Sequence, residues 1–124
     1  MDDDDILCAV CAFQLADFDV DALPLLLVGI RTDPKAPDDP SSTLLAQLQA
    51  RWPKTQPLSA RPSGAPPAGA LLLDNGPITR TDVDKATVKG APAVPGGALR
   101  VYAYVVERRD GAWAVTSSRT TLMV

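Results

Sequence analysis

The chain has 124 residues, the usual length of one domain, and can bury roughly two-thirds of the surface that its unfolded form exposes. Hydrophobic residues make up 46% of it and charged residues 22%, which argues against disorder throughout. With a net charge of −3 at pH 7 and no apolar run of about 18 residues, the sequence predicts one soluble domain, 1–124, with no membrane span.

Four aspartates, Asp2 to Asp5, begin the first predicted helix, because carboxylates cap free backbone N–H groups and oppose the helix dipole. This helix should run from about Asp4 to Asp17. It is apolar nearly all round, so we expect it across a sheet or in a subunit interface. A secretory signal would place Lys or Arg before the apolar stretch. The aspartates favour a cytoplasmic location, and a leader removed earlier is left open.

Cys8 and Cys11 lie on one face of this predicted helix, and three interpretations compete. A redox dithiol normally follows a strand, which is not expected here. Zinc would need two further ligands, but the chain has no other cysteine and no histidine. We therefore favour buried, reduced core cysteines, and the sequence predicts no cofactor.

A buried strand and a second helix follow along the chain. The apolar run from Leu23 to Ile30 has strand length and turn residues on both sides. Ser41 and Ser42 are good N-caps for a helix from about Ser41 to Trp52, which Pro53 ends. Residues 53–69 are rich in proline and predict a long irregular segment.

The second half of the chain predicts a meander of antiparallel strands, since short β-branched runs alternate with turn residues. The expected strands are 70–74, 78–81, 86–94, 98–108 and 112–123. The turns between them include Asn75-Gly76-Pro77 and Asp110-Gly111. The fold class is therefore α+β, with two helices packed on a mostly antiparallel sheet of five or six strands.

The last hairpin leaves two registers open. A two-residue turn at Asp110-Gly111 would place Tyr104 opposite Ser117, Tyr102 opposite Arg119 and Arg108 opposite Trp113. A three-residue turn with a glycine bulge would shift this pairing by one residue. Trp113 would then move to the other face of the sheet.

Parts of the sequence resemble an uncharacterised group of small bacterial α+β domains. The matching segments are L-L-A-Q-L-Q-A-R-W-P, Gln56-Pro57-Leu58-Ser59, L-L-L-D-N-G-P-I, D-V-D-K-A-T-V-K-G and L-R-V-Y-A-Y-V-V-E-R-R-D-G-A-W-A-V. The closing R-D-G-A-W-A-V is also similar to the last hairpin of nuclear-transport-factor-like and other cystatin-like domains. Enzymes of that kind commonly use an Asp-His pair in a cone-shaped pocket. This chain has no histidine, so the resemblance implies a fold and not an activity.

Catalytic, metal and nucleotide motifs do not form in this sequence. Without histidine, the Ser-His-Asp and Cys-His arrangements are excluded. Asp17-x-Asp-x-Asp21 begins like a calcium loop but continues with Ala22 and Val28 where Gly and Glu are needed. Asp82-x-Asp84 fits a tight turn, and the glycines open no phosphate loop. An enzyme is therefore disfavoured.

One strand carries the candidate interaction face. Arg100, Tyr102, Tyr104 and Arg108 alternate along it, and the neighbouring strand can add Trp113 and Arg119. We expect the helices to cover the opposite face, which consists of Leu99, Val101, Ala103 and Val105. The polar-aromatic face would then be either solvated or a recognition surface, since Tyr and Arg are favoured interface anchors.

Three functional hypotheses follow. The leading one is a non-catalytic binding or assembly module that meets a protein partner or a second copy through this face or through the exposed side of the first helix. The alternative is a small-ligand-binding or enzyme domain with a cone-shaped pocket lined by Trp113, Tyr104 and a carboxylate. The third is an acidic inhibitor or immunity-type protein, because residues 1–40 have a net charge of −8 and residues 41–124 one of +5. Nucleic acid is not an expected partner, since the basic residues are dispersed.

Overall fold

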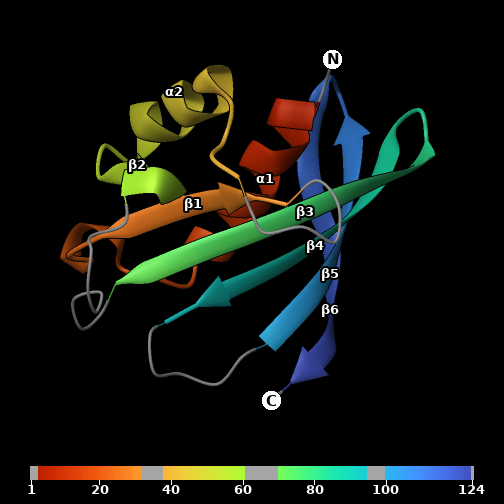
Figure 1. Ribbon diagram of the computed structural model, residues 1–124. Helices are drawn as coiled ribbons and strands as arrows, with labels where there is room; N and C mark the ends of the chain where they lie inside the picture. The colour runs from red at the N-terminus through yellow and green to blue at the C-terminus, as the bar shows by residue number, and fades with distance from the viewer. Residues whose placement is uncertain (1–2, 32–37, 61–69, 95–99, 124) are drawn as a thin grey trace.

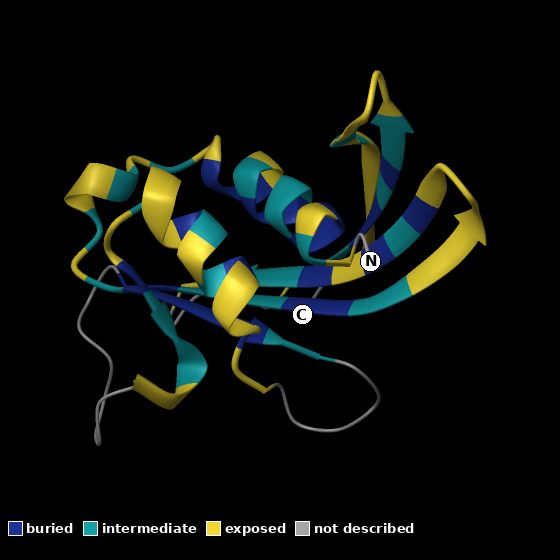
Figure 2. Ribbon diagram, turned by 90° about the horizontal axis from the view of Figure 1, so that it is seen from above, coloured by how far each residue is buried: buried dark blue, intermediate teal, exposed yellow. Residues whose placement is uncertain are grey.

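The computed structural model describes residues 3–31, 38–60, 70–94 and 100–123 (Figure 1). It has two α-helices and a mostly antiparallel six-stranded sheet, in the order β2-β1-β3-β4-β5-β6. Both helices lie on the same side of the sheet (Figures 1 and 2). The predicted α+β class is confirmed. None of the helices among the described residues is both long and apolar enough to cross a membrane.

The helices begin and end close to their predicted bounds. Helix α1 spans Asp3–Leu15 and helix α2 spans Ser42–Arg51. Ser41 caps α2, since its hydroxyl oxygen accepts a hydrogen bond of 3.0 Å from the backbone N–H of Leu44. The same hydroxyl donates to the carboxylate of Asp4, which ties the start of α2 to the first turn of α1.

Two short parallel strands form one edge of the sheet. Strand β1, Leu26–Ile30, pairs in parallel with β2, Thr55–Pro57, and with β3 on its other side. Short 3-10 helices, Val20–Ala22 and Leu58–Ala60, flank them. The predicted irregular segment 53–69 is therefore wrong at β2, and its residues 61–69 lie outside the described residues.

The meander consists of four long strands: β3 Leu71–Asp82, β4 Lys85–Ala93, β5 Arg100–Arg109 and β6 Ala112–Met123. Adjacent strands are antiparallel, as predicted. The two short strands expected at 70–74 and 78–81 are, however, one strand.

Asn75-Gly76-Pro77 is an irregularity within β3 and not a hairpin turn, so that prediction is wrong. The Gly76–Pro77 peptide bond is cis, and Gly76 has φ +121°. A Cβ atom at Gly76 would lie 2.0 Å from the carbonyl oxygen of Arg31. The Arg31 N–H donates to the carbonyl of Asn75 at 2.8 Å, so this close approach joins β3 to the end of β1.

The last hairpin has the two-residue turn, followed by a bulge. Asp110 and Gly111 have φ +54° and +78°, as a type I′ turn requires, and Arg108 lies opposite Trp113. The register then shifts between Val105 and Val106. Because of this shift, Tyr104 faces Ser118 and Tyr102 faces Thr120, instead of the predicted Ser117 and Arg119.

The sheet face that α1 covers is the opposite of the one expected. Helix α1 packs on α2 and on β3, β4, β5 and β6. Tyr104 and Val106 lie in the core beneath it, with 3% and 0% of their surface exposed. Val101, Ala103 and Val105 alternate with them and point away from α1. The predicted exposed face of Tyr102 and Tyr104 is therefore the concave, helix-covered side of the sheet.

Candidate functional site

A buried polar cluster lies where α1 crosses the sheet. Gln14 of α1 and Asn75 of β3 exchange two hydrogen bonds, of 2.7 and 2.8 Å. The Gln14 amide also donates to the hydroxyl of Tyr104 at 3.3 Å, and the Asn75 amide donates to the sulfur of Cys11 at 3.4 Å. These contacts satisfy amides that would be costly to bury unpaired, and they fix α1 over β3 and β5.

Gly90 on β4 leaves room for this cluster. A Cβ atom there would lie 2.5 Å from Asn75 Oδ1, 2.7 Å from Tyr104 Cε2 and 2.8 Å from Gln14 Nε2. Only a residue without a side chain fits at that distance. No local pattern predicts this cluster, because Gln14 is 61 positions from Asn75 and 90 positions from Tyr104 along the chain.

Beside the cluster, the last residues of α1 and the concave face of the sheet enclose a hollow of about 310 Å³, here called the tyrosine pocket. Gln14 and Tyr104 form part of both the cluster and the pocket wall. Phe13 packs edge-on against Tyr104, with ring centroids 5.8 Å apart, and the rings of Tyr102 and Tyr104 are 5.9 Å apart. The remaining lining residues are Asp17, Phe18, Pro92, Arg100 and Ser118.

Two polar side chains of the tyrosine pocket, Arg100 and Tyr102, have no polar partner in the part of the chain that the structure describes. Among the described residues, the guanidinium of Arg100 has no ion pair or hydrogen bond, and neither has the hydroxyl of Tyr102. The Tyr104 hydroxyl accepts from Gln14, so its own proton is available to donate. Burial raises the pKa of Tyr104 above its usual value, against the lowering effect of the Gln14 hydrogen bond. This phenol therefore stays neutral, and a donor, at neutral pH.

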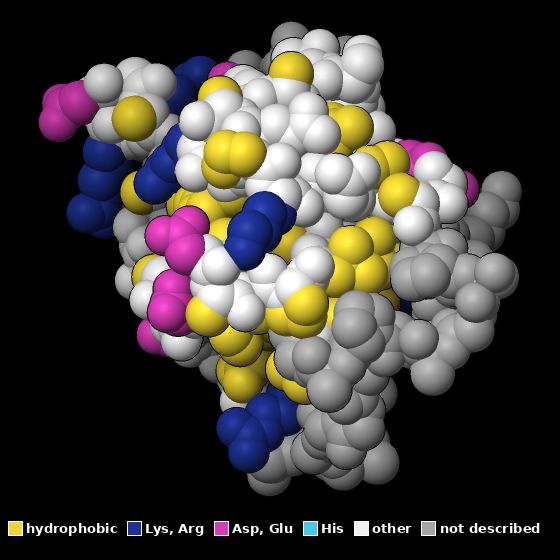
Figure 3. Space-filling model, turned by 90° about the vertical axis from the view of Figure 1, so that its left-hand side faces the viewer, with side chains coloured by type: hydrophobic (Ala, Val, Ile, Leu, Met, Phe, Trp, Pro, Cys, Tyr) yellow, Lys and Arg dark blue, Asp and Glu magenta, His cyan; other side chains and the backbone are white. Residues whose placement is uncertain are grey.

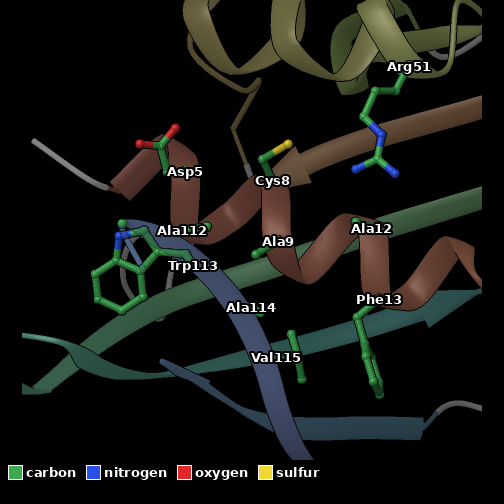
Figure 4. A pocket seen from close by; sticks show the side chains of 11 residues that line it. Asp5, Cys8, Ala9, Ala12, Phe13, Arg51, Ala112, Trp113, Ala114 and Val115 are labelled. Atoms are coloured by element: carbon green, nitrogen blue, oxygen red, sulfur yellow. The ribbon is translucent and has the colours of Figure 1, made fainter. Parts of the chain in front are cut away.

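A second hollow, the α1–β6 groove, lies on the outer side of α1 (Figure 4) and encloses about 600 Å³. Its helix wall is Cys8, Ala9, Ala12 and Phe13, and its other wall consists of Gly111 of the turn and Ala112 to Val115 of β6. Asp5 and Trp113 lie at one end of the groove, and Phe13 and Arg51 lie at the other (Figure 4). Cys8 is half-buried and Cys11 fully buried, and both are free thiols.

The six residues of the predicted interaction face are separated by the fold. Arg100, Tyr102 and Tyr104 come together in the tyrosine pocket, whereas Trp113 lines the α1–β6 groove. Arg108 lies with its guanidinium carbon 5.5 Å from the Trp113 ring and pairs with Asp84 at 2.6 Å.

Arg119 does not join the other five. It lies opposite Ala103, so it faces away from α1. The predicted pocket lining of Trp113, Tyr104 and a carboxylate is likewise divided between two hollows. Tyr104 and Asp17 line one of them, and Trp113 and Asp5 line the other.

The two carboxylate motifs of the sequence, Asp17-x-Asp-x-Asp21 and Asp82-x-Asp84, lie at a short helix and at a turn. Asp19 precedes the short 3-10 helix before β1, and Asp21 lies within that helix. Asp82 accepts a hydrogen bond of 2.7 Å from the backbone N–H of Val83, which fits the predicted tight turn. Within the described ranges, no group of three or more acidic or cysteine side chains could hold a metal ion.

Charged side chains of both signs share the side of the molecule that carries β2 and the start of β1 (Figure 3). Among the side chains coloured there, Lys and Arg lie near Asp and Glu, and hydrophobic side chains show between them. Lys54, for example, donates to the backbone carbonyl of Leu23 at 3.2 Å. The charge difference between the two parts of the chain therefore does not build a single-sign surface on this side.

The chain matches no family model, no curated protein and no solved structure. The resemblance to nuclear-transport-factor-like and cystatin-like domains therefore stays a prediction. What the two hollows can bind has to be argued from their own residues.

Proposed function

We propose that this protein is a non-catalytic binding module whose tyrosine pocket takes a small organic anion with an aromatic or apolar body. The observation that supports the proposal is that Arg100, Tyr102 and Tyr104 all line one aromatic-walled hollow. Three of the six predicted recognition residues thus lie together, on the concave side of the sheet.

Each part of the pocket suits one part of such a ligand. Phe13, Phe18 and Pro92 offer apolar walls to a ring or short chain. Arg100 supplies a fixed positive charge with several N–H donors, the geometry that carboxylates and sulfonates match. The volume of about 310 Å³ lies at the lower end of small-ligand pockets, which limits the ligand to a small molecule.

Asp17 sets a further requirement. Its carboxylate lies on the α1 side of the pocket and repels an anion, unless the ligand also carries a donor or positive charge that faces it. A zwitterionic or donor-bearing aromatic acid therefore suits the pocket better than a simple acid. We expect Asp17→Asn to strengthen the binding of a simple aromatic carboxylate a few-fold, measured by calorimetry.

Two probes that differ only in charge test the proposal: naphthalene-2-carboxylate and the neutral naphthalene-2-carboxamide. Arg100→Gln should weaken carboxylate binding about tenfold and change carboxamide binding much less, because only the acid forms an ion pair with the guanidinium. Arg119→Gln is the matched control, since it removes the same charge from the opposite face of the sheet. If the wild-type protein bound neither probe, or if both variants lost binding equally, the proposal would be wrong.

A further inference from the structure

The outer side of α1 offers a second binding surface, which shares only Phe13 with the tyrosine pocket. Cys8, Ala9 and Ala12 are only half-buried there, and the Phe13 side chain is 42% exposed. The other wall belongs to β6, the edge strand of the described sheet. An apolar hollow that runs beside an edge strand is a typical contact site for another polypeptide.

The two ends of the α1–β6 groove carry opposite charges. Asp5, at one end, accepts a hydrogen bond of 3.0 Å from Gln47, and Arg51, at the other, lies 4.5 Å from the centroid of the Trp52 ring. In the described part of the chain, neither forms an ion pair. Both act on Cys8 between them: burial is the main cause that raises the pKa of Cys8, Arg51 lowers it and Asp5 raises it.

The groove is self-complementary under one kind of two-fold symmetry. Two copies can face each other about a two-fold axis that lies between them and is perpendicular to the length of the grooves. Each end of one groove then meets the opposite end of the other groove. Asp5 of one copy then faces Arg51 of the other, and Phe13 faces Trp113. An axis along the groove would instead bring like charges together, which is unfavourable.

We propose that the α1–β6 groove binds a second copy of this chain, as an antiparallel two-fold dimer in which Asp5 of each copy pairs with Arg51 of the other. Phe13 and Trp113 then pack against each other towards the ends of the interface. The alanine-lined helix walls of the two copies pack in its middle. This arrangement covers the exposed part of Phe13 and accounts for an α1 that is apolar on nearly every side.

Charge reversal tests both the dimer and its orientation, with the solution mass measured by sedimentation equilibrium over a range of concentrations. The wild-type chain should dimerise. Asp5→Lys and Arg51→Glu should each weaken the dimer at least tenfold, since each places two like-charge contacts in it. The doubly reversed chain should dimerise like the wild type, and a mixture of the two single variants should form a heterodimer.

Asp19→Lys and Arg119→Glu are matched controls, because they reverse exposed charges outside the groove. Both should dimerise like the wild-type chain. A wild-type chain that stayed monomeric at millimolar concentration would overturn the proposal. So would a dimer that both single reversals left unchanged, because the second copy would then sit elsewhere.

Discussion

At the scale of single residues, Gly90 is the position where the smallest chemical change should have the largest effect. A methyl group there would overlap three atoms of the cluster formed by Gln14, Asn75 and Tyr104. We expect Gly90→Ala to lower the free energy of unfolding by about 1–3 kcal/mol, as overpacked cores do, measured by urea denaturation. The same variant should weaken naphthalene-2-carboxylate binding, because Tyr104 must move.

Gly111→Asn is the control for Gly90→Ala. Gly111 lies in the exposed turn with nothing within 4 Å of an added Cβ atom, and asparagine tolerates positive φ. Its free energy of unfolding should change by less than about 0.5 kcal/mol. Equal effects of the two substitutions would show that Gly90 does not lie against the polar cluster.

The buried thiol of Cys11 should make the stability of the protein fall at alkaline pH. Burial raises its pKa from the ordinary 9.0 to about 12, so the folded protein keeps the thiol protonated where the unfolded chain loses the proton. The stabilisation is complete below pH 9 and is lost as the pH rises towards 12, by up to about 1.4 kcal/mol per pH unit. Cys11→Ala should therefore lose less stability than the wild type between pH 9 and 11, measured by urea denaturation. Parallel curves would contradict this assignment.

At the scale of the elements, local signals predicted the helix ends and the place of the last hairpin, but not the continuity of β3. Ser41 caps α2 as expected, and Asp110-Gly111 forms the two-residue turn, one of the two alternatives that the sequence left open. Both depend on a few neighbouring residues and their backbone preferences. Strand β2 escaped prediction because it has only three residues, and Pro57, its last, is unusual in a strand.

The alternation along β5 correctly predicted which residues share a face, but not which face α1 covers. Val101, Ala103 and Val105 look more apolar than Tyr102 and Tyr104, so hydrophobicity favoured the wrong side. Helix α1 contacts the Tyr104 side through apolar packing and through hydrogen bonds from Gln14 to Asn75 and to Tyr104, between residues remote in the sequence. Contacts between residues so far apart in the chain leave no pattern among neighbouring residues from which they could be predicted.

Trp113 of β6 contacts arginines of both hairpins, β3–β4 and β5–β6, and one of these arginines pairs with α1. The guanidinium carbons of Arg80 and Arg108 each lie 5.5 Å from its ring centroid, and Arg80 pairs with Asp3 at 2.8 Å. Trp113→Leu should lower the free energy of unfolding by about 1–2 kcal/mol, mainly through the two lost cation–π contacts. Arg109→Ala, which breaks an exposed ion pair in the same hairpin, should cost less than about 0.5 kcal/mol. If thermal and urea unfolding ranked the two variants the other way, Trp113 would not have this role.

At the scale of the whole molecule, the fold class could be predicted from the sequence, whereas the candidate site could only be predicted in part. Three of its residues, Arg100, Tyr102 and Tyr104, were recognised as a group because they share one face of one strand. Their enclosure depends on the placement of α1 over the concave face of the sheet. That placement arises from packing among segments distant in sequence, so the sequence suggested a flat surface where the fold makes a pocket.

The proposed function requires that the end of α1 and the concave face of β5 together form one binding pocket. An NMR titration of the ¹⁵N-labelled protein with naphthalene-2-carboxylate tests it most directly. We expect saturable changes in the amide signals of Phe13 to Phe18 and Arg100 to Tyr104, and little change at Arg119. Changes confined to the α1–β6 groove, or spread evenly over the surface, would contradict the account.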